Sequence, residues 1–468
     1  MPKSQALTKD YYKQKAYTLE NSLKNLNYHG IFDTASSDIK NSYTIPYALF
    51  LGATNAEIGL LNAMKNLATT LAQIPGSWLA RRFSRKFIWV FSMISSNILW
   101  LPIILAPFLQ LNISSFIILI AIATFLLSLN SAAWTSLAGD LVPKERKGHF
   151  FGFRYFLIGL SGLIATMISG VLIYYSFPLI FSISIILGFI AILFFIRIYE
   201  PETKRSFQYK YSLSFDLKSI KSSILMNEDL VIFTVFLTFM NFAVNMASPF
   251  IAVYQLRELN IGYLWFATIL SISALATIIC HPYWGQLSDR FGERRIIAAN
   301  GILVCFVPFF YLFSSSPLHI LLVEIFSSFA WSGFNLATFS LLLSLTPQDK
   351  RTKYVANHKF FIGIGAMLGA LLGGIMAETF KHSVFMLFSG LQIIFLVSFL
   401  LRVSSLLFMV KLRGMERKPA EYFIYRSIAV EPVRSVSQAM YYFRFNSIEK
   451  KLANPFRRIY YKIKMHMN

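Results

Sequence analysis

Stretches of about twenty consecutive apolar residues recur along almost the whole chain, and this feature limits the possible folds more than any other. A helix needs roughly 20 apolar residues to cross about 30 Å of bilayer hydrocarbon. Because lipid offers no hydrogen-bond partner to an exposed backbone, each stretch must be a helix, since barrel strands are shorter and alternate in polarity. The sequence therefore predicts an all-α polytopic membrane protein with about twelve transmembrane helices. We place them near residues 30–53, 57–80, 86–109, 112–138, 149–174, 178–197, 229–255, 261–283, 295–314, 318–343, 354–378 and 384–410.

The composition agrees with a membrane protein and excludes an ordinary soluble one. Hydrophobic residues make up 56% of the 468 residues and charged residues only 14%, against about 25% charged residues in soluble domains. The start, MPKSQALTKDYYKQK, lacks the apolar core of a cleavable signal peptide. We therefore expect the first helix to act as the insertion signal. The two cysteines, Cys280 and Cys305, are too few for a disulfide framework and are expected to be packing residues.

The positive charges lie in alternate connections between the predicted helices. The formal net charge is +22, and Lys and Arg gather at the N-terminus, in five connections and after residue 410. The connections QLNISS, YYSFP and SSSPLH contain neither residue. By the positive-inside rule both termini are cytoplasmic, which requires an even number of spans. Because topology accounts for the basic charge, we expect no nucleic acid as a partner.

The chain repeats itself. LVPKERKGHFFGFRYFLIGLSG (141–162) aligns with LTPQDKRTKYVANHKFFIGIGA (345–366), and LARRFSRK (79–86) aligns with LSDRFGER (287–294) at nearly the same offset. A parallel duplication of six helices is typical of transporters that bind solute between their two halves. We therefore expect five regions: a cytoplasmic N-terminal segment (1–29), an N-terminal six-helix bundle (30–197), a central cytoplasmic loop (198–228), a C-terminal six-helix bundle (229–410) and a basic cytoplasmic tail (411–468).

The segment GQLSDRFGERR (285–295) closely resembles the signature loop of the major facilitator superfamily, G-x-L-x-D-R-x-G-x-R-R. Helix count, duplication and the long central loop extend the resemblance over nearly all of residues 30–410. In that family the loop is a cytoplasmic gate element whose Arg residues latch the outward-facing state. The N-terminal copy departs from the pattern, because Arg81 stands where Asp is usual and Ser84 where the second Gly is usual. The resemblance implies a gate role, without substrate contact, for Asp289, Arg290, Gly292, Arg294 and Arg295, together with Arg82 and Arg85 in the N-terminal copy.

A further short segment, EPETK (200–204), resembles one found at the same place in sugar porters of the family. A solvated helix end built on Pro201 is the simpler interpretation of these five residues.

The predicted first helix carries Asp33, Asp38 and Lys40, which a lipid-facing helix would not tolerate. A charge at the bilayer centre costs roughly 3 kcal/mol or more, so such groups face a bundle interior or an aqueous path. In the family this helix lines the central cavity, and acidic residues on it carry the proton in several members. We favour cavity lining, with Asp38 as the first candidate for a proton site. The alternative is a helix that begins near Ser42, with residues 33–40 as a cytoplasmic lead-in.

Polar residues in other predicted spans complete the candidate substrate and proton path. Hydrogen bonding at a packed seam between helices is an equally good interpretation of the asparagines of the seventh helix, and tryptophan is also common as a packing residue. The candidates are Asn62, Lys65 and Asn66 on the second helix, Asn130 and Trp134 on the fourth, Asn241 and Asn245 on the seventh, and Glu324, Trp331 and Asn335 on the tenth.

The chain shows no catalytic signature: there is no His-Glu metal helix, no Gly-rich phosphate loop and no nucleophile elbow. We therefore expect no enzyme activity, no cofactor and no metal site. The sequence predicts a secondary active transporter of the plasma membrane that moves a small solute by alternating access, coupled to protons or another ion. The alternative is a non-transporting membrane receptor or lipid-handling scaffold. We expect a monomer whose basic tail lies on anionic lipids, and the identity of the solute and its direction stay open.

Overall fold

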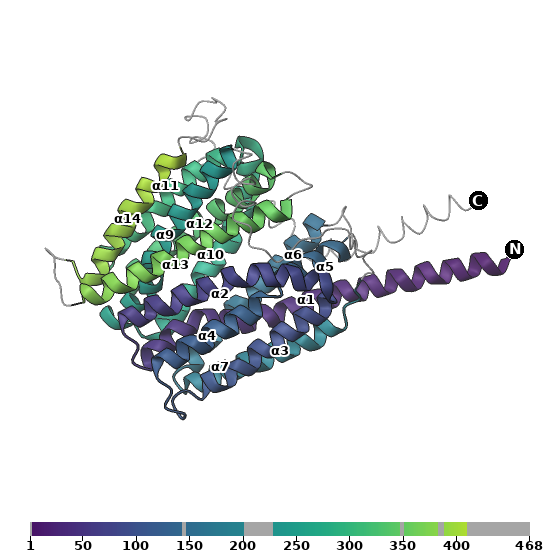
Figure 1. The fold of residues 1–468 in the computed structure, drawn as a ribbon, viewed down its shortest axis with the longest axis horizontal. Helices are drawn as coiled ribbons and strands as arrows, with labels where there is room; N and C mark the ends of the chain where they lie inside the picture. The colour runs from purple at the N-terminus through teal and green to yellow at the C-terminus, as the bar shows by residue number, and fades with distance from the viewer. Residues whose placement is uncertain (1, 143–146, 201–227, 347–350, 382–387, 410–468) are drawn as a thin grey trace.

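The computed structural model describes residues 2–142, 147–200, 228–346, 351–381 and 388–409. The regular elements of these residues are helices, arranged as two bundles side by side (Figure 1). The central loop from residue 201 onward and the tail lie outside the described residues. The N-terminal half contains α1 (Pro2–Phe50), α2 (Asn55–Arg82), α3 (Arg85–Ile104), α4 (Ile113–Ser128), α5 (Ser131–Leu141), α6 (Lys147–Leu172) and α7 (Phe177–Ile196). The C-terminal half contains α9 (Glu228–Val253), the π-helix η2 (Tyr254–Glu258), α10 (Gly262–Phe291), α11 (Glu293–Tyr311), α12 (Pro317–Leu345), α13 (Arg351–Thr379) and α14 (Gly390–Met409).

The predicted transmembrane helices are present. In the described part of the chain, 10 helical segments are long and apolar enough to cross a membrane, with α4 and α5 together forming one of them. Helices α1 and α2 are not among the 10, because polar residues interrupt their apolar sequence. Both nevertheless pack against helices that belong to the 10 segments. The all-α fold with about twelve transmembrane helices is therefore confirmed.

Helix α1 is continuous through residues 33–40, so the alternative in which the first helix begins near Ser42 is wrong. The helix also extends farther toward the N-terminus than the apolar stretch that begins near residue 30. In the turn that precedes residue 30, Leu26 and His29 are fully buried, and His29 packs edge-on against the ring of Trp89 at 4.6 Å. This turn thus buries apolar surface within the N-terminal half.

The signature loop is a single-residue break between two helices. Helix α10 continues to Phe291 rather than ending at 283, because Trp284 and Leu287 are buried inside the C-terminal half. Gly292 then adopts a φ of +82°, which side chains disfavour, and α11 begins at Glu293. The two connections that carry the repeated motif, 83–84 and 292, are therefore very short.

The two halves have the same internal packing. Helix α1 packs on α6 and α7 as α9 packs on α13 and α14, and α2 packs on α4 as α10 packs on α12. Between the halves, α2 packs on α13 and its counterpart α10 packs on α6. The packing therefore repeats as the sequence does. We call the end of the molecule that holds the α1–α2 turn (residues 51–54) the turn end, and the opposite end, with residues 83–84 and 292, the signature end.

Candidate functional site

Asparagines of α2 and α9 meet between the two halves. The side-chain amides of Asn66 and Asn62 donate to Oδ1 of Asn245 at 3.1 and 3.4 Å. The amide of Asn245 in turn donates to the carbonyl of Asn241 at 2.9 Å, and Asn241 donates to the carbonyl of Leu237 at 2.9 Å. We call Asn62, Asn66 and Asn245 the amide cluster. Hydrogen bonding between packed helices was one of the two interpretations of Asn245 from the sequence. It is present in the structure, and it joins the N-terminal half to the C-terminal half.

Lys65 lies next to the amide cluster in α2. Its side chain is half-buried, and among the described residues its ammonium group has no hydrogen bond or ion pair. An ammonium group inside a membrane protein is normally paired with a carboxylate or with carbonyl groups. Lys65 therefore contributes a positive charge that the described protein does not balance.

Lys40 points into the interior of the N-terminal half. Its ammonium donates to Oδ1 of Asn97 in α3 at 2.6 Å and lies 5.3 Å from the ring centre of Trp100. Its side chain is 9% exposed. The partner that the structure gives to Lys40 is thus an amide of its own half, and Asp33 interacts with it only electrostatically.

The two carboxylates of α1 lie in different surroundings. Asp33 interacts electrostatically with Lys40 and with Arg154 of α6, a buried residue whose guanidinium donates to the carbonyl of Leu26. Asp38 lies against α6 where Gly162 leaves room, because a Cβ at Gly162 would meet the Asp38 carboxylate. Within the described residues neither carboxylate accepts a hydrogen bond. Among these same described residues, no cation interacts electrostatically with Asp38, whereas Lys40 and Arg154 do so with Asp33.

Glu324 of α12 lies in a hydroxyl network inside the C-terminal half. Its Oε1 accepts a hydrogen bond from the hydroxyl of Tyr311 at 2.5 Å, and its Oε2 accepts one from Ser273 at 3.4 Å. The amide of Gln255 donates to the Tyr311 hydroxyl at 3.1 Å. Glu324 therefore has two hydroxyl donors and no ion pair among the described residues.

The aromatic candidates of the fourth and tenth helices have packing partners. The ring of Trp134 lies 5.6 Å from the guanidinium of Arg154, and Trp331 packs edge-on against Phe334 at 5.6 Å. Asn130 precedes the first residue of α5 without a capping hydrogen bond from its side chain, and Asn335 is exposed on α12. Both tryptophans thus pack against neighbouring side chains, which was the alternative to a binding role in the sequence analysis.

At the signature end, Arg85 binds within the N-terminal half. Its guanidinium lies 2.6 Å from Oδ2 of Asp140 and 3.3 Å from Oε1 of Glu200. Glu200 also accepts hydrogen bonds from the Ser84 hydroxyl at 2.6 Å and from the backbone N–H of Arg85 at 2.9 Å. Glu200, the first residue of EPETK, therefore caps the start of α3. The interpretation of this segment as a solvated helix end missed that role.

The surroundings of Glu200 favour its charged form. Burial acts to raise the pKa of Glu200, but the hydrogen bonds from Ser84, Arg85 and Lys86 outweigh burial and hold the pKa below its usual value. A carboxylate that accepts several N–H and O–H groups is stabilised in this way.

The C-terminal signature loop also forms an ion pair with a residue of its own half. Nη2 of Arg294 donates to Oδ2 of Asp229 at 2.9 Å, which ties the start of α11 to the start of α9. Asp289 is exposed and has no hydrogen bond or ion pair among the described residues. The remaining gate candidates lie at the same end, with Arg295 half-buried and the others exposed: Arg82, Arg290, Gly292 and Arg295.

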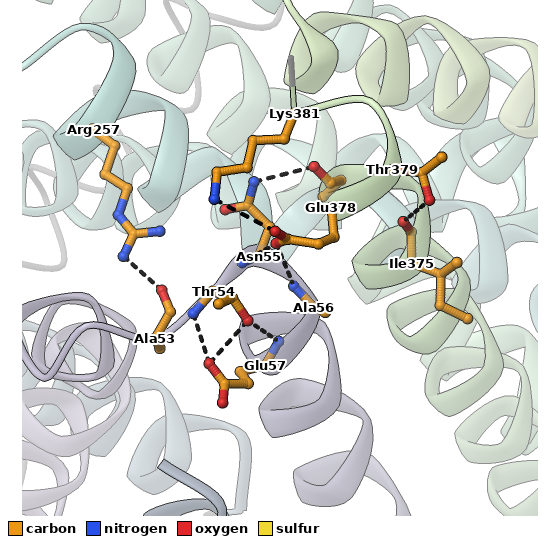
Figure 2. A network of polar contacts seen from close by, with 11 residues as sticks. Ala53, Thr54, Asn55, Ala56, Glu57, Arg257, Ile375, Glu378, Thr379 and Lys381 are labelled. Carbon is orange, nitrogen blue, oxygen red and sulfur yellow. Dashed lines mark hydrogen bonds and ion pairs between the residues drawn. The ribbon is translucent and has the colours of Figure 1, made fainter. Parts of the chain in front are cut away.

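Sequence reasoning missed the contacts at the turn end, where the halves are joined (Figure 2). The carboxylate of Glu378 in α13 accepts the backbone N–H groups of Asn55 and Ala56, and Arg257 of η2 donates to the carbonyl of Ala53. The sequence signal for these residues was weak, because each is a single charge at the end of an apolar stretch.

The comparisons with known proteins agree with this architecture. A family model described as Major Facilitator Superfamily matches residues 31–280 and 231–434. The chain belongs to the Major Facilitator Superfamily. It is therefore an integral membrane protein of a family of secondary transporters, and the resemblance of the signature loop is confirmed.

Individual relatives of the superfamily are distant. An MFS-type transporter of Methanocaldococcus jannaschii is 24% identical over 349 residues, which cover 71% of this chain and 85% of that protein. One of Bacillus subtilis is 24% identical over 189 residues, which cover 39% of this chain and only 46% of that protein. The solved structure of a D-xylose-proton symporter is similar with a TM-score of 0.64 and 16% identity, covering 85% of this chain and 98% of that one. At this identity the similarity shows the fold alone.

Proposed function

We propose that this protein is a proton-coupled secondary transporter that moves a small polar solute across the plasma membrane by alternating access. The amide cluster is the observation that carries the proposal. Asn62 and Asn66 of one half and Asn245 of the other meet inside the molecule, between the ends of their helices. A solute that replaces these hydrogen bonds contacts both halves at once, so its binding energy can favour one arrangement of the halves over another.

Lys65 determines which solutes we expect. It adds one positive charge beside the amide cluster, and no carboxylate among the described residues pairs with it. An anionic group on the solute would balance this charge, and the amides would bind its other polar groups. We therefore expect solutes with a carboxylate or a similar anionic group to be preferred over cations.

Asp38 is the proposed proton site. Its carboxyl group has no hydrogen-bond donor and no neighbouring cation among the described residues, so a proton can bind it without displacing a partner. Glu324 is the second candidate, but Tyr311 and Ser273 already donate to its carboxylate. Proton coupling is known for a protein of the same fold, the D-xylose-proton symporter.

The positive-inside rule supports an orientation with the signature end in the cytoplasm and the turn end outside. At the turn end, Glu378 and Arg257 of the C-terminal half form hydrogen bonds with the backbone of Asn55 and Ala53 in the N-terminal half. These contacts support a transporter that is closed toward the outside in this structure.

Solute uptake into proteoliposomes under an imposed pH gradient tests the proposal. Pools of sugars, amino acids, organic anions, organic cations and drugs are compared for the parent protein, Asp38→Asn, Glu324→Gln and Lys65→Gln. Glu57→Gln is the matched control, since Glu57 is a carboxylate of α2 whose hydrogen bonds to described residues lie within its own half. We expect gradient-driven uptake of an anionic pool, loss of that uptake in Asp38→Asn with solute exchange retained, and weaker solute affinity in Lys65→Gln.

Each other outcome removes one part of the proposal. Gradient-driven uptake that survives in Asp38→Asn but not in Glu324→Gln would move the proton site to Glu324. Transport of cations in preference to anions would refute the role of Lys65. The absence of uptake and exchange for every pool would favour the receptor or scaffold alternative.

A further inference from the structure

The α1–α2 turn of the N-terminal half is held from two sides by opposite charges of the C-terminal half (Figure 2). On one side, Oε2 of Glu378 accepts the backbone N–H of Asn55 at 3.0 Å and that of Ala56 at 3.4 Å. On the other side, Nη2 of Arg257 donates to the carbonyl of Ala53 at 2.6 Å. An anion therefore binds the first two amides of α2, directly after the turn, while a cation binds the carbonyl of Ala53 in the turn.

The start of α2 is a favourable place for a carboxylate from another element. The first N–H groups of a helix have no partner within the helix, and they form the positive end of the helix dipole. The α2 helix satisfies its third N–H by itself, through a capping box in which Thr54 and Glu57 bond each other. The first two N–H groups, of Asn55 and Ala56, bind Glu378 instead. The cap of α2 is thus completed by the other half.

Further contacts show that the halves fit closely here. The buried side chain of Asn55 donates to the carbonyl of Ala377 at 3.1 Å. One turn farther along α2, Gly59 faces Gly374 of α13, and a Cβ on Gly59 would meet the backbone of α13. Glu378 therefore acts between two helices, α13 and α2, that are already in backbone contact.

We propose that Glu378 and Arg257 form a latch on the α1–α2 turn, which keeps the turn end closed and must release before solute can pass that end. The proposal rests on the alternating access proposed above. Lys381 lies on the same half as Glu378, with its ammonium 3.4 Å from Oε1 of that residue. When the halves separate, Lys381 moves with Glu378 and continues to balance its charge, so the latch can open and close repeatedly.

The distance between the halves at the turn end tests the latch directly. Spin labels are attached at Leu109→Cys and Ser315→Cys, two exposed positions in turn-end connections of opposite halves, after Cys280 and Cys305 have been replaced by Ser. Double electron–electron resonance then gives the distance distribution without added solute. We expect one short distance in the parent. In Glu378→Ala a longer distance appears, and the ratio of open to closed molecules rises about tenfold because charge-assisted hydrogen bonds are lost.

Glu57→Ala is the matched control. It also removes a carboxylate at the start of α2, but in the described part of the chain this carboxylate accepts hydrogen bonds from Thr54 of its own half. We expect it to keep the short distance. Glu378→Gln keeps one acceptor oxygen without the charge, so its ratio of open to closed molecules should be intermediate. This variant replaces Glu378→Ala in the test if Glu378→Ala does not fold. Arg257→Ala should open the turn end as well.

A distance distribution in Glu378→Ala or Glu378→Gln that equals the parent's would overturn the latch, as would equal opening in Glu57→Ala. The result is independent of the transport assay. Unchanged distances together with proton-driven uptake would refute the latch and leave the transporter. Opening in Glu378→Ala together with no uptake of any solute would refute the proposed function and leave the latch.

Discussion

Replacing Tyr311 by Phe should destabilise the protein more than replacing another fully buried tyrosine, Tyr43. The hydroxyl of Tyr311 donates to Glu324 at 2.5 Å and accepts from Gln255 at 3.1 Å. A hydrogen bond to a charged group contributes about 1.5–3 kcal/mol, and a buried group left without a partner costs about 1–3 kcal/mol. Gln255 is 2% exposed and its Oε1 already lacks a partner among the described residues. Its amide therefore cannot turn to water, and the two losses together amount to about 2.5–6 kcal/mol.

Tyr43→Phe provides the comparison, because it removes the same atom from an equally buried ring. The Tyr43 hydroxyl makes one hydrogen bond, to the carbonyl of Thr166 at 2.7 Å. Losing a neutral hydrogen bond of this kind costs about 1 kcal/mol. Unfolding in mixed micelles, followed by circular dichroism, compares the free energies of unfolding of the two variants. A loss in Tyr311→Phe equal to or smaller than that in Tyr43→Phe would refute the view that Tyr311 satisfies both Glu324 and Gln255.

Three further predictions concern the ends of the molecule. Because the pKa of Glu200 is held below its usual value, Glu200 stabilises the fold above a pH of about 4.3 and loses this effect as the pH falls through its lowered pKa. The difference in unfolding midpoint between the parent and Glu200→Gln should therefore be largest near neutral pH and shrink in acid; a constant difference would contradict it. Gly59→Ala places a Cβ against the backbone of Gly374 and should lengthen the spin-label distance at the turn end, whereas an unchanged distance would show that the helices adjust locally. Asp229→Asn should lower the free energy of unfolding by about 1 kcal/mol through the loss of its ion pair with Arg294, and an unchanged midpoint at low salt would contradict this.

The architecture could be predicted from the sequence because a long apolar stretch that crosses lipid must form a helix. A backbone without water must form a helix, so the helix count followed from the lengths of the stretches. The ends of helices were less predictable. Helix α10 continues to Phe291 because Trp284 and Leu287 find apolar contacts beyond the apolar stretch, and such contacts depend on neighbouring helices.

The residues of the candidate site were easier to predict than their partners. The cost of burying charge identified Lys40 as an inward-facing residue, and its side chain is indeed buried. Its hydrogen-bond partner is Asn97, a residue that spacing along α1 does not indicate. Glu378 binds Asn55 across more than three hundred residues of sequence, and only the packing of α2 on α13 brings them together. Partners of this kind depend on the rotation and approach of helices, which the pattern of one helix does not contain.

Solute counterflow tests the central claim, that this protein moves a solute across the membrane, most directly. Proteoliposomes loaded with an unlabelled solute pool are diluted into the same solute in labelled form, without a pH gradient. We expect transient accumulation of label for at least one anionic pool, equal in the parent, Glu57→Gln and Asp38→Asn, and weaker in Lys65→Gln. No accumulation of any pool in the parent, with the protein folded and inserted, would contradict a transport function.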